Sequence, residues 1–182
     1  MSFLLEFVFG LFNGTLALWV AGVLFNNYAP STVDLGLGLL NSLSGITGIV
    51  TQTVFLRRFL KRMGEINLLI LGLTTYLLSI LFFAIFSTLW LIILAVVLLS
   101  FGIGITYPPL NSLATKIVPE EMRGGMLGYT NATLSLGIIF GTAIAGLLFQ
   151  IQPTLQFWVG VGLLLIAMLI SMMLRQHLTT QK

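Results

Sequence analysis

Six uncharged polar side chains are the residues of this sequence best suited to hold a small molecule. Amide and phenol groups both donate and accept hydrogen bonds, so they can bind a polar solute. At neutral pH they neither titrate nor act as nucleophiles without a neighbouring base, so binding is the chemistry that we expect from them. The six are Asn13, Asn41, Gln52, Tyr107, Asn111 and Asn131.

The combinations of residues that catalysis or metal binding requires are missing from the sequence. It has no cysteine, and its single histidine, His177, stands close to the carboxyl end. No His and Glu residues have the spacing of a metal site, and no nucleophile motif is present. We therefore predict a protein that is not an enzyme and that uses no metal, cofactor or disulfide.

Composition indicates the environment in which these polar residues must lie. Hydrophobic residues make up 58% of the 182 positions and charged residues only 7%, whereas a soluble domain is about one quarter charged. No charge stands between Glu65 and Lys116 or between Arg123 and Arg175. A single bilayer crossing needs about 20 residues, so each gap has room for two. We predict an integral membrane protein.

The spans can be delimited by the polar and turn-forming stretches between apolar runs. "NNYAPSTVD", "FSTLW" and "QIQPT" are such stretches, and the basic segment "RRFLKRMGE" is another. The predicted fold is an all-α membrane protein with one domain over residues 1–182. Its six transmembrane helices are expected at about 3–27, 35–57, 66–87, 89–116, 123–149 and 155–175.

Positive charge is distributed on one side of this predicted topology. If the six helices alternate in direction, all eight Lys and Arg residues fall on the side of the two termini, and the opposite loops carry only Asp34. The positive-inside rule then places both termini in the cytoplasm. Four of the eight, Arg57, Arg58, Lys61 and Arg62, form one cluster. It is either a topology anchor beside anionic lipid or a functional loop, and it is too short and too near the bilayer to bind nucleic acid.

Helical periodicity gives four of the six predicted helices a small or polar face. In residues 89–116 the spacing of Ser100, Gly104, Tyr107, Asn111 and Thr115 defines one face. Comparable faces occur in 35–57 around Asn41 and Gln52, in 3–27 around Asn13, and in 123–149 around Asn131. Such faces serve either close helix packing or the lining of a pocket, and the sequence alone leaves both open.

Two further features of these helices have alternative interpretations. Pro108 and Pro109 remove backbone donors inside 89–116, so a kink is expected there. The kink is either purely structural or part of a binding site or gate. Glu6 is near the start of the first helix, where its side chain could extend to the membrane interface. The alternative is a role in proton transfer.

Two stretches of the sequence resemble a known family. The first is "QTVFLRRFLKRMGEINLLILGL" (52–73), which resembles the loop after the second helix of each half of the major facilitator superfamily. The second is "YPPLNSLATKIVPEEMRGGMLGYTNATLSLGIIFGTAIAGLLF" (107–149), which resembles the tenth helix, the following loop and the eleventh helix of bacterial permeases in that superfamily. The matching residues are Pro109, Leu110, Val118, Pro119, Glu120, Glu121, Arg123, Gly124, Gly128, Gly137, Gly141 and Gly146.

The resemblance implies the carboxy-terminal six-helix half of a twelve-helix secondary transporter in a bacterial inner membrane. Such a half provides one wall of a cavity for a small molecule or drug and works by alternating access with a second six-helix half. The family places its third and sixth helices outside and lines the cavity with the other four. The cytoplasmic gate segments implied here comprise Arg57, Arg58, Lys61, Arg62, Gly64, Glu65, Glu121 and Arg123.

Two alternatives remain at this point. The chain could be a six-helix membrane scaffold or degenerate transporter remnant that binds a partner without moving a solute. It could also be a half that associates with a second copy of itself and transports as a dimer.

Overall fold

The computed structural model describes the backbone of residues 1–180 and the side chains of residues 1–176. These residues are helical over almost their whole length, as the long apolar runs predict. Three short connections occur at residues 25–29, 86–88 and 152–154, and residues 117–119 separate α4 from the following 3-10 turn. The elements are α1 (Ser2–Trp19) with a π-helical end (Val20–Leu24), α2 (Pro30–Val50) with a π-helical end (Thr51–Phe55), α3 (Leu56–Ile85), α4 (Leu89–Lys116), a 3-10 turn (Glu120–Met122), α5 (Arg123–Ile151) and α6 (Leu155–Thr180).

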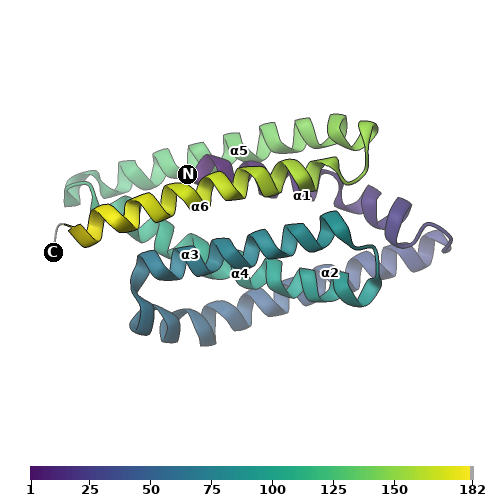
Figure 1. Ribbon diagram of the computed structural model, residues 1–182, viewed down its shortest axis with the longest axis horizontal. Helices are drawn as coiled ribbons and strands as arrows, with labels where there is room; N and C mark the ends of the chain where they lie inside the picture. Colours follow the sequence, from purple (N-terminus) through teal and green to yellow (C-terminus); the bar gives the residue numbers. More distant parts are fainter. Residues whose placement is uncertain (181–182) are drawn as a thin grey trace.

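The helices run roughly along one common axis and form an elongated bundle (Figure 1). One end of the bundle holds the start of α1, the end of α4 and the start of α5, together with the turn at Gly64. We call it the basic end, because it also holds Lys116, Arg123 and the cluster that begins at Arg57. The three short connections lie at the opposite end.

One glycine reverses the chain between the second and third crossings. The stretch from Pro30 to Ile85 is assigned as one helical segment, so five helical segments of the described residues qualify by length and composition as membrane spans. Within the third helix Gly64 has φ 74° and ψ 170°, and the helix bends sharply there. This positive φ suits a residue without a Cβ atom. Since Gly64 divides the 56-residue segment into two arms, the bundle has six crossings, in agreement with the sequence prediction.

The basic cluster lies on a helix and not in a loop, which is a correction to the expected boundaries. The helix that was predicted to end near residue 57 continues to the turn at Gly64. Lys and Arg are good helix formers, and no Gly or Pro stands between Thr51 and Met63 to stop the helix. At its other end this arm begins at Pro30, earlier than predicted, because Pro is well suited to the first position of a helix.

Two helix pairs pack backbone against backbone. Between α1 and α5, a Cβ atom added to Gly10 would lie 2.6 Å from the Ile138 carbonyl oxygen, and one added to Gly137 would lie 2.7 Å from that of Phe3. Between α3 and α4, a Cβ added to Gly102 would lie 2.7 Å from the Tyr76 amide nitrogen. Small residues permit such close approach in membrane helices. Close helix packing, one of the two interpretations of the small faces, is therefore confirmed at Gly10, and Gly102 and Gly137 pack in the same way.

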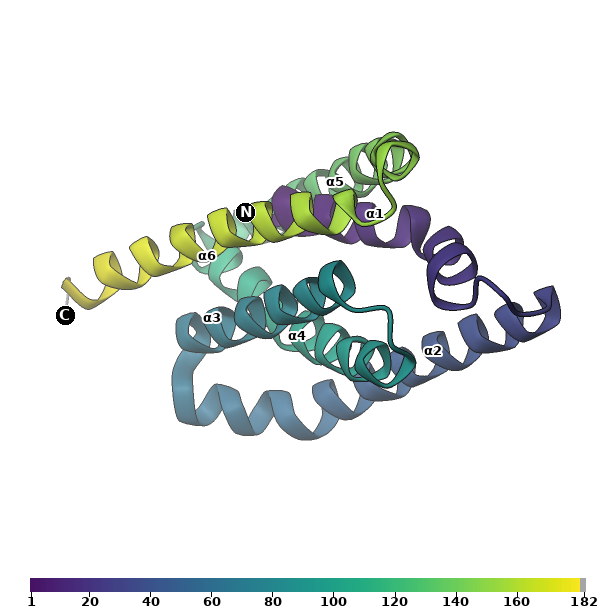
Figure 2. The ribbon, with the colours of Figure 1, turned by 45° about the vertical axis from the view of Figure 1, so that its right-hand side comes forward.

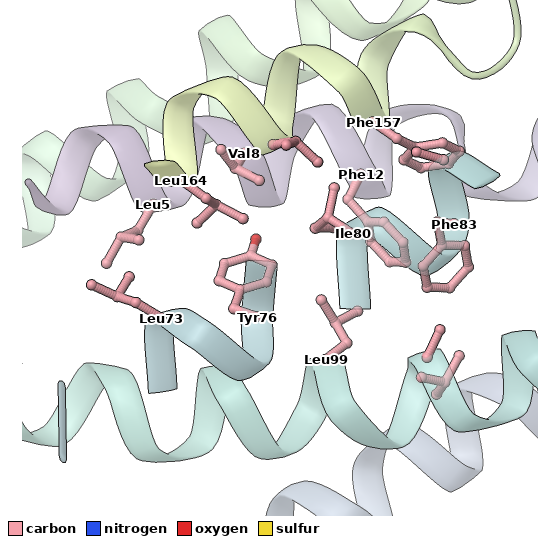
Figure 3. Close-up of a cluster of buried hydrophobic side chains, with 14 of the residues drawn as sticks. Leu5, Val8, Phe12, Leu73, Tyr76, Ile80, Phe83, Leu99, Phe157 and Leu164 are labelled. Carbon is pink, nitrogen blue, oxygen red and sulfur yellow. The ribbon is translucent and has the colours of Figure 1, made fainter. Parts of the chain in front are cut away.

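Aromatic side chains fill the centre of the bundle where α1, α3 and α6 meet. The rings of Phe12 and Phe83 are 4.8 Å apart in an edge-to-face arrangement (Figure 3). Trp19 packs edge-on against Phe83 and Phe157. Beside this cluster Thr15 donates a hydrogen bond to the fully buried Gln156. This pair was not predicted, although Gln156 is an amide between Leu155 and Phe157 at the start of α6.

The flanking helices α2 and α5 are the least covered (Figure 2). Only four of the 29 residues of α5 are buried, and three of them, Gly137, Gly141 and Ala145, form a single stripe against α1. On α2, only Val33 and Leu40 are buried. Much of both helices therefore remains available to lipid or to another protein. By contrast α3, which the resemblance placed on the outside, buries nine residues.

Candidate binding cavity

A cavity of about 340 Å³ lies between the middle parts of α1, α2 and α4. Phe83 of α3 also contributes to its wall. The residues that line it are Phe9, Phe12, Asn13, Leu16, Leu40, Asn41, Ser44, Gly48, Gln52, Phe83, Val96, Leu99, Ser100, Ile103 and Gly104. The size and the mixture of apolar walls with a few polar groups are typical of small-molecule sites.

The polar groups of the cavity come from three helices. Asn13 of α1 donates from its amide to the Phe9 carbonyl oxygen at 3.1 Å, which leaves its own carbonyl oxygen available. Ser44 of α2 and Ser100 of α4 are hydrogen-bonded at 2.7 Å, and Ser100 also donates to the Val96 carbonyl oxygen at 3.0 Å. Since a hydroxyl has one proton, Ser44 is the donor to Ser100. The cavity can thus hydrogen-bond a solute.

Three of the six predicted polar residues meet in this cavity. Asn13, Asn41 and Gln52 line it, and all three are exposed in the chain as it stands. The cavity is therefore open on one side and is not enclosed by this chain. Its aromatic components, Phe9, Phe12 and Phe83, were not predicted, because a Phe in an apolar run gives no signal that distinguishes a cavity from a core.

The other three predicted residues lie outside the lining of the cavity. Tyr107 and Asn111 are nearer the basic end of α4 than Gly104, which is the last residue of α4 in the wall. Asn131 is exposed on α5, and its backbone oxygen accepts a hydrogen bond from Ser135 at 3.0 Å. Periodicity predicted the correct side of α4, but it does not show how far along the helix the cavity extends.

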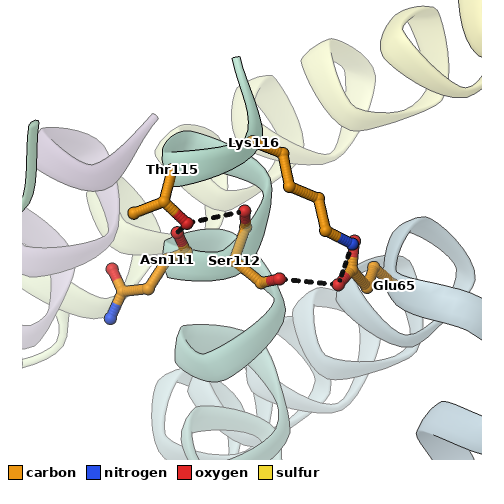
Figure 4. A network of polar contacts seen from close by, with 5 residues as sticks. All are labelled: Glu65, Asn111, Ser112, Thr115 and Lys116. Carbon is orange, nitrogen blue, oxygen red and sulfur yellow. Dashed lines mark hydrogen bonds and ion pairs between the residues drawn. The ribbon is translucent and has the colours of Figure 1, made fainter. Parts of the chain in front are cut away.

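At the basic end, Glu65 connects α3 to α4. Its carboxylate accepts hydrogen bonds from Ser112 at 2.6 Å and from Lys116 at 2.7 Å (Figure 4). Within the described residues one other ion pair occurs, between Arg123 and Glu120 at 2.8 Å. Glu121 and the four basic residues Arg57, Arg58, Lys61 and Arg62 are exposed.

Pro108 and Pro109 are in the interior of α4, which is assigned as one helix from Leu89 to Lys116. Because proline has no amide proton, the carbonyl oxygens of Gly104 and Ile105 lack their usual helical donors. One turn earlier, Thr106 donates to the Gly102 carbonyl oxygen at 2.6 Å. A kink at this position stays a prediction.

Taken together, the fold and the site define an integral membrane bundle of six crossings built beside a polar, open cavity. The sequence matches the family model described as the Major Facilitator Superfamily over residues 2–181, and the chain belongs to that family. It is similar to the quinolone resistance protein NorA of Staphylococcus aureus strain COL, with 24% identity over 178 residues. That alignment covers 97% of this chain and 44% of NorA.

A second relative is also named as a resistance protein. Multidrug resistance protein 1 of Bacillus subtilis strain 168 is 25% identical over 116 residues, which cover 64% of this chain and 30% of that protein. The chain thus spans less than half the length of the curated relatives that it matches.

Proposed function

We propose that this chain is one six-helix half, the carboxy-terminal one, of a major facilitator transporter that moves a small molecule by alternating access. The open cavity is the observation that carries this proposal. Asn13, Asn41 and Gln52 are exposed along a bundle that is otherwise apolar. Polar groups are costly when they face hydrocarbon, so a second half that covers the open side would complete the site.

The surface for that second half is provided by α2 and α5. A Cβ added to Gly38 or Gly45 of α2, or to Gly128 or Gly146 of α5, would meet nothing within 4 Å. Small residues on an open face allow another helix to approach closely. The exposed Asn131 lies on the same helix as Gly128, and we propose that the completed cavity reaches it. The second half is a separate chain, another segment of a longer chain or a second copy.

The residues of the basic end are assigned to the gate of the assembled transporter. In this proposal Gly64, Glu65, Glu121, Arg123 and the cluster from Arg57 to Arg62 face the second half across the cytoplasmic opening. The exposure of the cluster supports the assignment, since it leaves these charges accessible to a partner.

The relatives' names suggest which solute to test first. Because both are resistance proteins, a fluorescent quinolone is the probe that we choose. The chain is expressed in efflux-deficient bacteria alone, and together with the part of NorA that the alignment does not cover, as a separate polypeptide. We expect lower accumulation of the quinolone in the second strain, and an unchanged level in a strain that carries the NorA segment alone. Equal accumulation in all strains, with both chains present in the membrane, would favour a scaffold without transport.

The proposed orientation has its own test. The start of α1 and the described end of α6 at Thr180 lie toward the basic end, and we place that end in the cytoplasm of a bacterial inner membrane because the Lys and Arg residues gather there. Lys182, which contributes to this count, is outside the described residues. Single cysteines at Thr88 and Gln152 should react with a membrane-impermeant thiol reagent added to intact cells, whereas one at Lys61 should react only after lysis. Labelling of Lys61 in intact cells would reverse the orientation.

A further inference from the structure

Glu6 is buried in the bundle, although the sequence also allowed its side chain to extend to the membrane interface. Its side chain is only 9% exposed, and its Cβ atom would lie 2.9 Å from a Cβ added to Gly137 of α5. The carboxyl group is therefore held inside the bundle between α1 and its neighbours. A buried ionisable group in a membrane helix usually has a function.

Two tyrosine hydroxyls come close to this carboxyl group. Tyr76 of α3, which is 1% exposed, and Tyr107 of α4 both interact electrostatically with Glu6. Figure 3 shows the hydroxyl of Tyr76 directed from α3 toward α1 and α6. One oxygen of Glu6 and both hydroxyl oxygens are buried and make no hydrogen bond of normal geometry among the described residues, although Tyr107 is near enough to Glu6 for the two groups to interact. Three unsatisfied oxygens in one place are unusual, because buried polar groups are normally paired.

No cation of the described residues neutralises Glu6. The two ion pairs join Glu65 to Lys116 and Glu120 to Arg123. From α5, Glu6 meets the backbone at Gly137, and Arg175, the ionisable side chain described on α6, lies beside Asn67 of α3. The titratable groups that face Glu6 are thus the two tyrosines.

An isolated carboxylate is far more costly in such surroundings than a neutral carboxylic acid. We propose that Glu6 is a proton-binding site in which the carboxyl oxygen takes up one proton and Tyr76 and Tyr107 hydrogen-bond to the group. A phenol hydroxyl donates to the ionised carboxylate and accepts from the protonated acid, so the same two residues serve both states. The proton is the only ligand exchanged, and no covalent bond changes besides its O–H bond.

The position of this site connects it to the cavity. Glu6 is one helical turn from Phe9, and Tyr107 is one turn from Gly104, and both Phe9 and Gly104 line the cavity. The site therefore adjoins the cavity at its basic end. Tyr107 also directly precedes Pro108, where α4 has lost a helical hydrogen bond. The use of this proton in transport rests on the proposed function, whereas its binding does not.

The test detects the proton on the carboxyl group itself. The 182-residue chain is placed in lipid nanodiscs with ¹³C at the side-chain carboxyl carbon of its four glutamates, Glu6, Glu65, Glu120 and Glu121. At pH 7 we expect one carbon to keep the chemical shift of a protonated acid while the other three show that of a carboxylate. That signal should be lost in Glu6→Gln and retained in the matched control Glu120→Gln.

Two variants keep the test decisive if Glu6→Gln does not fold. Tyr107→Phe and Tyr76→Phe retain Glu6 and remove one hydroxyl each, so each should displace the pH at which the Glu6 signal titrates. Four carboxyl carbons that titrate together, or a signal that neither Tyr→Phe variant moves, would overturn the proposal. The measurement does not depend on transport. Absence of transport would therefore not contradict the proton-binding site at Glu6, and absence of the protonated signal would not contradict the proposed transport function.

Discussion

The contact between α1 and α5 and the contact between α2 and α4 are built in opposite ways. Between α1 and α5, glycines bring the backbones together, and a Cβ on Gly141 would collide with the backbone of Phe7. Between α2 and α4, side chains separate the backbones, with the Ser44–Ser100 hydrogen bond at 2.7 Å and the cavity beside it. The first contact fixes two helices as a unit, whereas the second leaves room for a ligand and for movement.

The difference also shows that glycine has two roles in this chain. The glycines that meet backbone atoms are confined to the pairs α1–α5 and α3–α4, whereas those of α2 mostly face open space. Whether a glycine serves close packing or lies on an open surface can therefore be decided only when the position of the neighbouring helix is known.

The largest effect is expected from a bulky side chain in the α1–α5 contact. Gly141→Leu would push Phe7 and the rest of α1 away from α5, and overpacking of this kind costs about 3 kcal/mol. We expect a large fall in the folded fraction after heating, measured by size-exclusion chromatography of the chain in detergent. Gly146→Leu is the matched control on the same helix. Its position is open, so a change within about 0.5 kcal/mol is expected. Equal losses in the two variants would refute the comparison.

A moderate effect, on binding and not on folding, is expected from the same substitution at the cavity. Gly48 lines the cavity, and a Cβ there meets nothing within 4 Å. Gly48→Leu should therefore leave thermal stability within about 0.5 kcal/mol of the parent. It should weaken binding of the fluorescent quinolone to the assembled transporter about tenfold, or about 1.4 kcal/mol, by filling the site. Gly38→Leu, which lies on α2 outside the cavity, is the control for the thermal stability of the chain alone. Unfolding of Gly48→Leu would show that the α2–α4 contact is as tight as the α1–α5 contact.

The smallest effect is expected at the basic end, where α3 and α4 are already joined by their glycine contact. Lys116 is 62% and Glu65 20% exposed at the side chain, so water and salt weaken their attraction. A double-mutant cycle of Glu65→Gln and Lys116→Met should give a coupling energy of about 0.5 to 1 kcal/mol, and less in high salt. A coupling of several kcal/mol would indicate that the ion pair, and not the glycine contact, holds these helices together.

Much of the architecture could be predicted from the sequence, because bilayer thickness and the cost of charge in lipid limit where helices begin and end. The six crossings follow from these two constraints, and the polar sides of the helices follow from helical periodicity. The extent of the cavity did not follow. Asn41 and Gln52 line the cavity but Asn111 does not. This difference depends on where α1 and Phe83 lie along α4, which the sequence does not show. The burial of Glu6 was likewise unpredictable, since it results from Gly137 on a helix far away in sequence.

The α1–α5 contact also has a consequence for the order of folding. Ser79 of α3 and Ala95 of α4, which are hydrogen-bonded, are 16 residues apart, so this pair can associate soon after synthesis. Gly10 and Thr142 are 132 residues apart in the chain, and closing a longer loop has a higher entropic cost. Contacts between distant segments generally form late. The most closely packed helix pair of the bundle therefore forms only after the fifth crossing has been synthesised. Until then the glycine face of α1 lies in the bilayer without its partner α5.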